Sequence, residues 1–191
     1  MPPELHISLA ALKSNLDFFR RIIKKSTELS AVVKSDAYGL GITKIVPEIA
    51  KCDVKSFFTA TISEAIKVRS CSPHSEIFTL NGFDFLNAKL YKEFNITPVI
   101  NNILEAQKFI EIFNQTHSAA LQLNTGMNRL GLNKQALFGN LDKINSLPLN
   151  LILSHLACAD DISNRENITQ KNLFIELCKA FPKIRKSIAA S

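Results

Sequence analysis

A lysine at the end of an apolar segment is the residue of this sequence with the clearest chemical potential. Lys34 follows the apolar residues 31–33 and precedes Tyr38 and two glycines, Gly39 and Gly41. Burial at the end of an apolar strand disfavours the charged form of an amine. An uncharged lysine amine is the nucleophile that Schiff-base chemistry requires. The alternative is a lysine whose amine simply reaches solvent from a strand end.

Two more segments place polar side chains after apolar stretches. Arg129 follows the residues Thr-Gly-Met-Asn and precedes Leu-Gly. Glycines let a backbone pass close to a ligand, and a guanidinium donates to a carboxylate in a fixed geometry. The alternative for Arg129 is a solvated side chain on a surface turn. His155 ends an apolar run, and a lone histidine in such a place is commonly a hydrogen-bonded core residue.

Apolar runs with the length of strands alternate with helical patterns along the whole chain. Leucines and phenylalanines recur at helical spacing between 9 and 23, after Ser8 as a possible N-cap. Further helices are expected to begin near Thr43, at Ser63, at Asn102 in a variant capping box, at Asn133 and at Thr169. The predicted strands are 29–33, 56–59, 76–80, 96–100, 119–123, 149–154 and a weak 184–188.

This alternation predicts an α/β fold with a parallel sheet built from βαβ units. Polar or glycine residues follow many of the strands, as in Asn81-Gly82, Asn101-Asn102 and Asn124. A doubly wound sheet would concentrate such residues at one switch point, whereas a barrel presents them from many strand ends. We therefore expect a (β/α)8 TIM-barrel-type fold. It is expected to be incomplete, with about seven strands, because 191 residues are few for a closed barrel.

Composition bounds the class of protein. The net charge of +6 is mild, and the basic residues fall mainly where helices are expected to end, so we expect no binding to nucleic acid. The four cysteines show no metal-ligand spacing, which predicts reduced, mostly buried thiols and no metal site. Neither a signal peptide nor a membrane-spanning run is recognisable, so a cytoplasmic location is expected.

The segment 31–41 resembles the cofactor-lysine segment of the alanine racemases, a fold-type III family that uses pyridoxal 5'-phosphate (PLP). The resemblance continues in order along the chain, through the segments 121–131, 154–160 and 187–191, together with Gln170 and Phe174. It implies that residues 1–191 are part of the PLP-binding N-terminal barrel domain, ending in or near the seventh strand. The β-rich C-terminal domain of the family is then missing.

The resemblance also implies a role for five residues. Lys34 would form an aldimine with PLP and act as a catalytic acid and base. Tyr38 and Ser191 would bind the phosphate of PLP. Arg129 would donate to the phenolic oxygen of PLP and lie near the substrate carboxylate. His155 would pack on the side of the cofactor ring.

The implied function is alanine racemase, which interconverts L-alanine and D-alanine and so supplies D-alanine for peptidoglycan. The full-length enzyme is expected to be a homodimer. In the family, the second catalytic base is a tyrosine in the part missing here, and neither Tyr38 nor Tyr91 lies in a matching segment. We therefore expect this chain to be a partial or truncated form with impaired catalysis. Serine or another small amino acid is an alternative substrate.

Two positions depart from the family pattern. Gln122 stands where some members have a carbamylated lysine that positions the arginine, so an amide or a bound anion would have to orient Arg129. Asn124 stands where an aspartate is common, which removes one negative charge near Arg129.

Two other hypotheses stay open. The chain could be a non-catalytic, single-domain PLP-binding protein. It could also be an interaction or structural fragment that does not fold stably, with exposed strand edges expected at 149–153 and near Ile184.

Overall fold

A computed structural model describes residues 4–190 of the chain. The chain consists of two compact units, the first ending at Thr79 and the second beginning at Leu80. Within the described residues no helix is long and apolar enough to cross a membrane. The same residues contain no group of three or more histidine, cysteine, aspartate or glutamate side chains placed to bind a metal ion.

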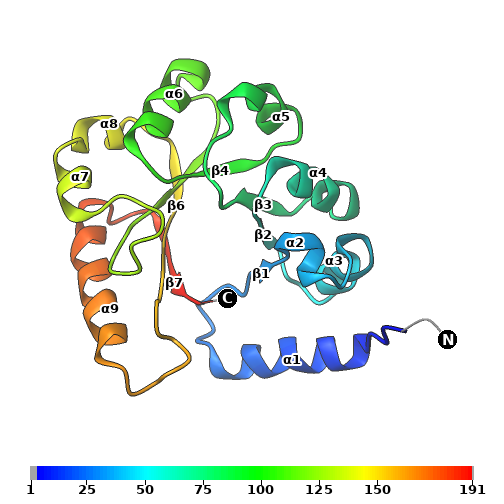
Figure 1. The fold of residues 1–191 in the computed structure, drawn as a ribbon. Helices are drawn as coiled ribbons and strands as arrows, with labels where there is room; N and C mark the ends of the chain where they lie inside the picture. The colour runs from blue at the N-terminus through cyan, green and yellow to red at the C-terminus, as the bar shows by residue number, and fades with distance from the viewer. Residues whose placement is uncertain (1–3, 191) are drawn as a thin grey trace. The chain divides into compact units, whose positions relative to one another are not determined.

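The first unit contains three short parallel strands, β1 (Ala31–Val32), β2 (Ser56–Thr59) and β3 (Glu76–Thr79). Strand β2 pairs with β1 on one side and with β3 on the other. The connecting helices α3 (Ile42–Lys51) and α4 (Ile62–Cys71) lie side by side beyond the strands (Figure 1). All four residues of β2 are buried, which is the pattern of a parallel strand covered on both faces.

Helix α1 (Leu9–Ile22) begins at the predicted cap, where the Ser8 side chain accepts a hydrogen bond from the Ala11 N–H. Its apolar spacing predicts a face packed on a core. In the described structure, however, none of its residues is buried, and Phe18 and Phe19 are half exposed.

The second unit continues the alternation of strands and helices. Its strands are β4 (Thr97–Ile100), β5 (Ala119–Gln122), β6 (Leu149–His155) and β7 (Arg185–Ala189). Each pairs in parallel with the next one along the chain. The helices are α5 (Ala88–Glu93), α6 (Ile103–Phe113), α7 (Lys134–Phe138), α8 (Leu141–Asn145) and α9 (Arg165–Leu177), with 3-10 turns η1 (Phe85–Asn87) and η2 (Cys178–Ala180).

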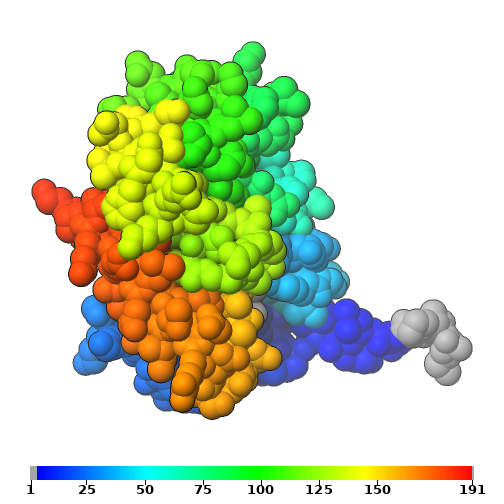
Figure 2. Space-filling model, turned by 60° about the vertical axis from the view of Figure 1, so that its left-hand side comes forward, coloured from blue at the N-terminus to red at the C-terminus, as the bar shows by residue number. Residues whose placement is uncertain are grey.

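An aromatic cluster fills the core beneath α6. Phe83 packs against Phe109, Phe113 and Tyr91, with ring centroids 5.4 to 5.6 Å apart. On the outside of the unit, Figure 2 shows α9 in orange, close to α7 in yellow-green. An ion pair between Lys134 and Glu176, 2.6 Å long, joins these two helices.

The expected fold class is confirmed. Inside each unit the strands follow one another in chain order, with no reversal that would mark the switch point of a doubly wound sheet. The described residues contain seven parallel strands alternating with helices, which is an incomplete (β/α)8 barrel-type fold.

Three further local expectations are wrong. The helix expected from Asn133 is divided into α7 and α8 around Gly139-Asn140, where the Asn140 amide donates to the Ala136 carbonyl instead of continuing the helix. Helix α9 begins at Arg165 rather than Thr169, because the Asn164 side chain caps it. Residues 149–153 are no edge, because β6 pairs with both β5 and β7.

Candidate active site

Lys34 lies directly after the two-residue strand β1. The Val33 N–H donates to the Phe58 carbonyl, which extends the pairing with β2 up to the residue before the lysine. Lys34 is half-buried, and its Nζ lies 5.9 Å from the centroid of the Tyr38 ring. Within the described part of the chain its amine has no acidic partner. The amine is therefore not committed to an ion pair.

The residues after Lys34 form a turn, α2 (Lys34–Tyr38), of left-handed helix. The φ angles of Ser35, Asp36, Ala37 and Tyr38 lie between 53° and 55°, a conformation that costs an L-residue roughly 1–2 kcal/mol. Sequence reasoning did not anticipate this turn, because none of these residues is the glycine that a left-handed conformation favours.

Hydrogen bonds hold this strained turn. The Ala37 N–H donates to the Val33 carbonyl (2.9 Å), and the Gly39 N–H donates to the Ser35 carbonyl (3.0 Å). The Asp36 carboxylate accepts from the Ile42 N–H (3.0 Å), which caps the following helix α3. The turn is therefore continuous with the start of α3.

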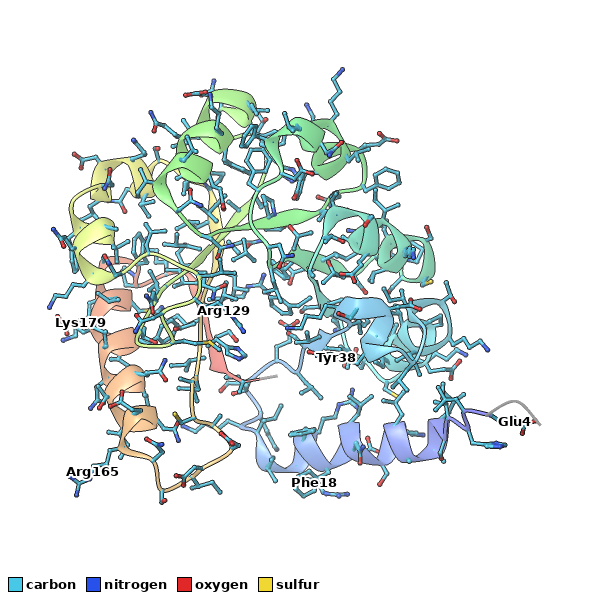
Figure 3. All side chains as sticks on the ribbon, in the orientation of Figure 1. Glu4, Phe18, Tyr38, Arg129, Arg165 and Lys179 are labelled. Atoms are coloured by element: carbon cyan, nitrogen blue, oxygen red, sulfur yellow. The ribbon has the colours of Figure 1, made fainter. Side chains whose placement is uncertain are left out.

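Tyr38 is the last residue of the turn, and it is labelled in Figure 3. Its side chain is 55% exposed, and its hydroxyl makes no hydrogen bond to the described residues. The phenol is therefore free to donate to an anion. Lys34 and Tyr38, which the sequence predicted as one group, are brought together in the structure.

Arg129 lies in the loop between β5 and α7 (Figure 3). The Asn124 side chain shapes this loop: its oxygen accepts from the Gly126 N–H (3.1 Å) and the Asn128 N–H (3.0 Å), and its amide nitrogen donates to the Asn128 side chain (3.0 Å). Gly131 closes the loop at a φ of 100°, where a Cβ would lie 2.9 Å from backbone atoms of residues 122–124. Only glycine fits there.

The guanidinium of Arg129 is exposed and makes no hydrogen bond or ion pair with residues 4–190. Gln122 is buried at the end of β5, and no hydrogen bond joins its amide to Arg129. Among the described residues, the Gln122 amide therefore does not orient this arginine. The free guanidinium is available to an oxygen of a ligand.

His155 ends strand β6. Beside it lies the completely buried amide of Gln170, whose Nε2 donates to the His155 carbonyl (3.0 Å) and to the Thr125 hydroxyl (3.2 Å). The same amide accepts from the Ala157 N–H (2.9 Å). The loop that contains Arg129 is therefore joined to the end of β6 through this amide. Ser191, the fifth predicted residue, lies outside the described residues.

Glu64 is a residue at this site that sequence reasoning used only as a helix start. Its carboxylate accepts a hydrogen bond from the Ser35 N–H at 2.7 Å, directly after Lys34. The available signal was the sequence Thr-x-x-Glu, which predicts a capping box but not a bond to the turn 29 residues earlier.

Comparisons with known proteins give the family. Residues 7–191 match the family model described as alanine racemase, N-terminal domain. An alanine racemase of Rickettsia canadensis (strain McKiel) is 36% identical over 194 residues, which cover 98% of this chain and 54% of the relative.

Solved structures agree with this match. The alanine racemase of Bartonella henselae, described with covalently bound pyridoxal phosphate, is 30% identical with a TM-score of 0.88, covering 96% of this chain and 53% of that one. The biosynthetic alanine racemase of Pseudomonas aeruginosa is 27% identical with a TM-score of 0.85, covering 95% and 51%. The chain thus spans about half the length of these relatives. Because the family model matches almost all of its residues, the chain belongs to the alanine racemase family, over the part that forms the family's N-terminal domain.

Proposed function

We propose that this chain provides the cofactor-binding half of a PLP-dependent racemase that interconverts L-alanine and D-alanine. The observation that supports it most is the Lys34 amine, placed at a strand end without an acidic partner among the described residues and beside the Tyr38 ring. The Bartonella relative, described with covalently bound pyridoxal phosphate, supports the same cofactor here.

The predicted site residues of each unit suit PLP by their chemistry. An amine combines with an aldehyde, a phenol donates to a phosphate, and a guanidinium donates to a phenolic oxygen or a carboxylate. Lys34 would bind the cofactor covalently, and Tyr38 and Ser191 would bind its phosphate. Arg129 would donate to its phenolic oxygen and to the substrate carboxylate, with His155 beside the ring. When bound, PLP serves as an electron sink that makes the substrate Cα proton acidic.

Racemisation needs a proton carrier on each face of the substrate Cα, within hydrogen-bond reach of that carbon's proton. Lys34 Nζ would be the carrier on one face. The chain has two tyrosines. The Tyr91 hydroxyl is buried, donates to the Gly82 carbonyl and accepts from the Asp84 N–H. Tyr38 is assigned to the phosphate, so neither tyrosine supplies the second carrier.

This absence favours impaired catalysis in the chain by itself, and it keeps a non-catalytic PLP-binding protein as the second candidate function. We further propose that residues 1–191 are part of a PLP-binding barrel domain, that the complete enzyme is a homodimer, and that it acts in the cytoplasm to supply D-alanine for peptidoglycan.

The test is to incubate the purified chain with PLP, reduce it with borohydride and map the label by mass spectrometry. We expect the label on Lys34 and none at that position in Lys34→Ala, while the control Lys44→Ala is labelled like the wild type. A label spread evenly over the exposed lysines would contradict the proposal. A specific label without D-alanine formation from L-alanine would favour the non-catalytic binding protein.

A further inference from the structure

We propose that Glu64 is a positioning residue for Lys34, an inference that rests on the proposed function. Its carboxylate binds the peptide group that directly follows the lysine. Glu64 Oε1 accepts from the Ser35 N–H at 2.7 Å, and Oε2 accepts from the Ala60 N–H at 2.8 Å and the Thr61 N–H at 3.3 Å. One carboxylate therefore joins the end of β2 to the turn after β1.

A role as a helix cap does not account for these distances. The capping-box bond to the Thr61 N–H is the longest of the three, and the bond to the Ser35 N–H is the shortest. Hydrogen bonds to an ionised carboxylate are shorter and stronger than those between neutral groups. The carboxylate is thus placed for the turn at least as much as for its own helix.

The bond to Ser35 helps to set the direction in which the Lys34 side chain leaves the backbone. A peptide group is planar, so two planes meet at the Lys34 Cα, and their orientations set its φ and ψ. The plane before Lys34 is held by the Ala37 N–H, which donates to the Val33 carbonyl. The plane after it is held by Glu64. Loss of Glu64 leaves one of these two planes without its side-chain acceptor.

The strain in α2 makes this bond necessary. Ser35 begins a run of left-handed residues that an L-chain does not adopt freely. The first N–H groups of a helical turn have no acceptor within the turn, and here the Ser35 N–H finds its acceptor in α4. Without the carboxylate, the turn can relax towards ordinary backbone angles, and the amine then moves.

The chain contains a matched control. Glu105 is also the third residue of its helix, and its carboxylate accepts from the Asn101 N–H (2.8 Å) and from the Phe83 N–H (3.3 Å) in the preceding loop. This is the same arrangement in the second unit, in loops that contain none of the predicted cofactor residues. Glu105→Gln therefore reports the general cost of weakening such a carboxylate.

The experiment measures the rate of PLP attachment at Lys34 relative to the exposed Lys44 in the same molecule. In this attachment the amine adds to the aldehyde carbon, and the aldehyde oxygen leaves as water. Borohydride stops each time point, and mass spectrometry gives the ratio of labels. General destabilisation alters the labelling rates of both lysines, whereas a positioning effect alters the labelling rate of Lys34 alone. Amide exchange at Ser35, followed by NMR without PLP, reports the hydrogen bond independently.

We expect Glu64→Gln to lower the Lys34-to-Lys44 ratio by roughly tenfold or more, because small misplacements of a reacting group have effects of this size. Its Ser35 amide should exchange faster. Glu105→Gln should keep the ratio within about twofold of the wild type. Thr61→Ala, which removes the hydroxyl that caps α4 and keeps the bond to Ser35, should do the same. If Glu64→Gln does not fold, Glu64→Asp, whose carboxylate is too short to reach Ser35, is expected to show the same loss.

Two results would overturn the inference in distinguishable ways. If Lys34 of the wild type is labelled selectively and the Lys34-to-Lys44 ratio is unchanged in the Glu64 variant, Glu64 does not position the lysine. The proposed function then stands. If Lys34 of the wild type is labelled no faster than Lys44, the proposed function is overturned and the inference falls with it. This holds even if slow amide exchange at Ser35 shows that the bond to Glu64 forms.

Discussion

Replacement of Gln170 should loosen the Arg129 loop against the end of β6, where the bond between the Thr125 and Ser154 hydroxyls (2.8 Å) remains. The amide is completely buried and takes part in three hydrogen bonds, with the Thr125 hydroxyl, the His155 carbonyl and the Ala157 N–H. Gln170→Leu keeps a similar volume but removes all three bonds.

The expected change in the free energy of unfolding follows from these contacts. Each lost bond costs about 1 kcal/mol, and the part-buried Ala157 N–H, which loses the Gln170 oxygen as its acceptor, adds a further penalty of about 1 kcal/mol. Burial of the leucine side chain returns about 1.5–3 kcal/mol. The net loss is about 2 kcal/mol, which for a chain of this length lowers Tm by roughly 4–8 °C.

Gln170→Glu adds a test through pH. One carboxylate oxygen can accept from Ala157, but the other faces the His155 carbonyl, so burial and the missing donor raise the pKa of the new carboxyl. A carboxyl whose pKa is raised on folding contributes stability below its unfolded pKa of about 4.3 and loses it as the pH rises through the folded pKa. We therefore expect Gln170→Glu to be more stable relative to the wild type at pH 5 than at pH 8.

Thermal unfolding at the two pH values checks both variants, and amide exchange over residues 124–131 reports the loop itself. A Tm for Gln170→Leu within about 1–2 °C of the wild type, which is roughly 0.5 kcal/mol, would refute the reasoning. If the Tm difference between Gln170→Glu and the wild type does not change with pH, the assignment of the Gln170 nitrogen as the atom that faces the His155 carbonyl is refuted.

Three more predictions test other parts of the structure. Burial raises the pKa of Glu105, although hydrogen bonds from the Asn101 and Phe83 N–H groups and from the Asn102 side chain act to lower it. The wild type should therefore lose stability relative to Glu105→Gln as the pH rises above about 4.3. Urea unfolding at a series of pH values measures this difference. Gly126→Ala should be destabilised by about 1 kcal/mol or more, since φ is 146° and the new methyl would lie 3.1 Å from the Gln170 side chain; thermal unfolding checks it. Burial raises the pKa of the Cys178 thiol, against the nearby charge of Lys186, so of the four free cysteines it should react most slowly with a disulfide reagent.

Most of the fold was predictable because its strands are short apolar runs with polar ends. The strand Ser56–Thr59 is found as expected, and the Asn102 cap begins α6 where the sequence predicted it. Apart from the strand edge expected at 149–153, the wrong expectations about secondary structure concern one end and one break of a helix. At these points an asparagine side chain competes with the backbone, as at Asn140 and Asn164.

The candidate site was predictable to a different degree. Lys34 and Tyr38 could be paired because they are four residues apart on one segment. The left-handed turn that sets their geometry was not predictable, because its stabilising acceptor, Glu64, lies 29 residues from Ser35. The cysteines were expected to be mostly buried, yet only Cys178 is. Burial of small residues depends on packing between elements, which local spacing does not give.

The predicted site residues Lys34, Tyr38 and Arg129 lie on segments that side chains from distant parts of the sequence help to hold. The turn after β1 is strained, and the loop after β5 leaves Arg129 exposed. In both cases a polar side chain of a later helix, Glu64 of α4 or Gln170 of α9, adds a hydrogen bond to the bonds within the loop. Removal of a methyl group from the core would lower the free energy of unfolding but would leave these hydrogen bonds to the loops in place. We expect loss of either polar group to let its loop move, so the positions proposed for the amine of Lys34 and the guanidinium of Arg129 would depend on two side chains that need not touch any ligand.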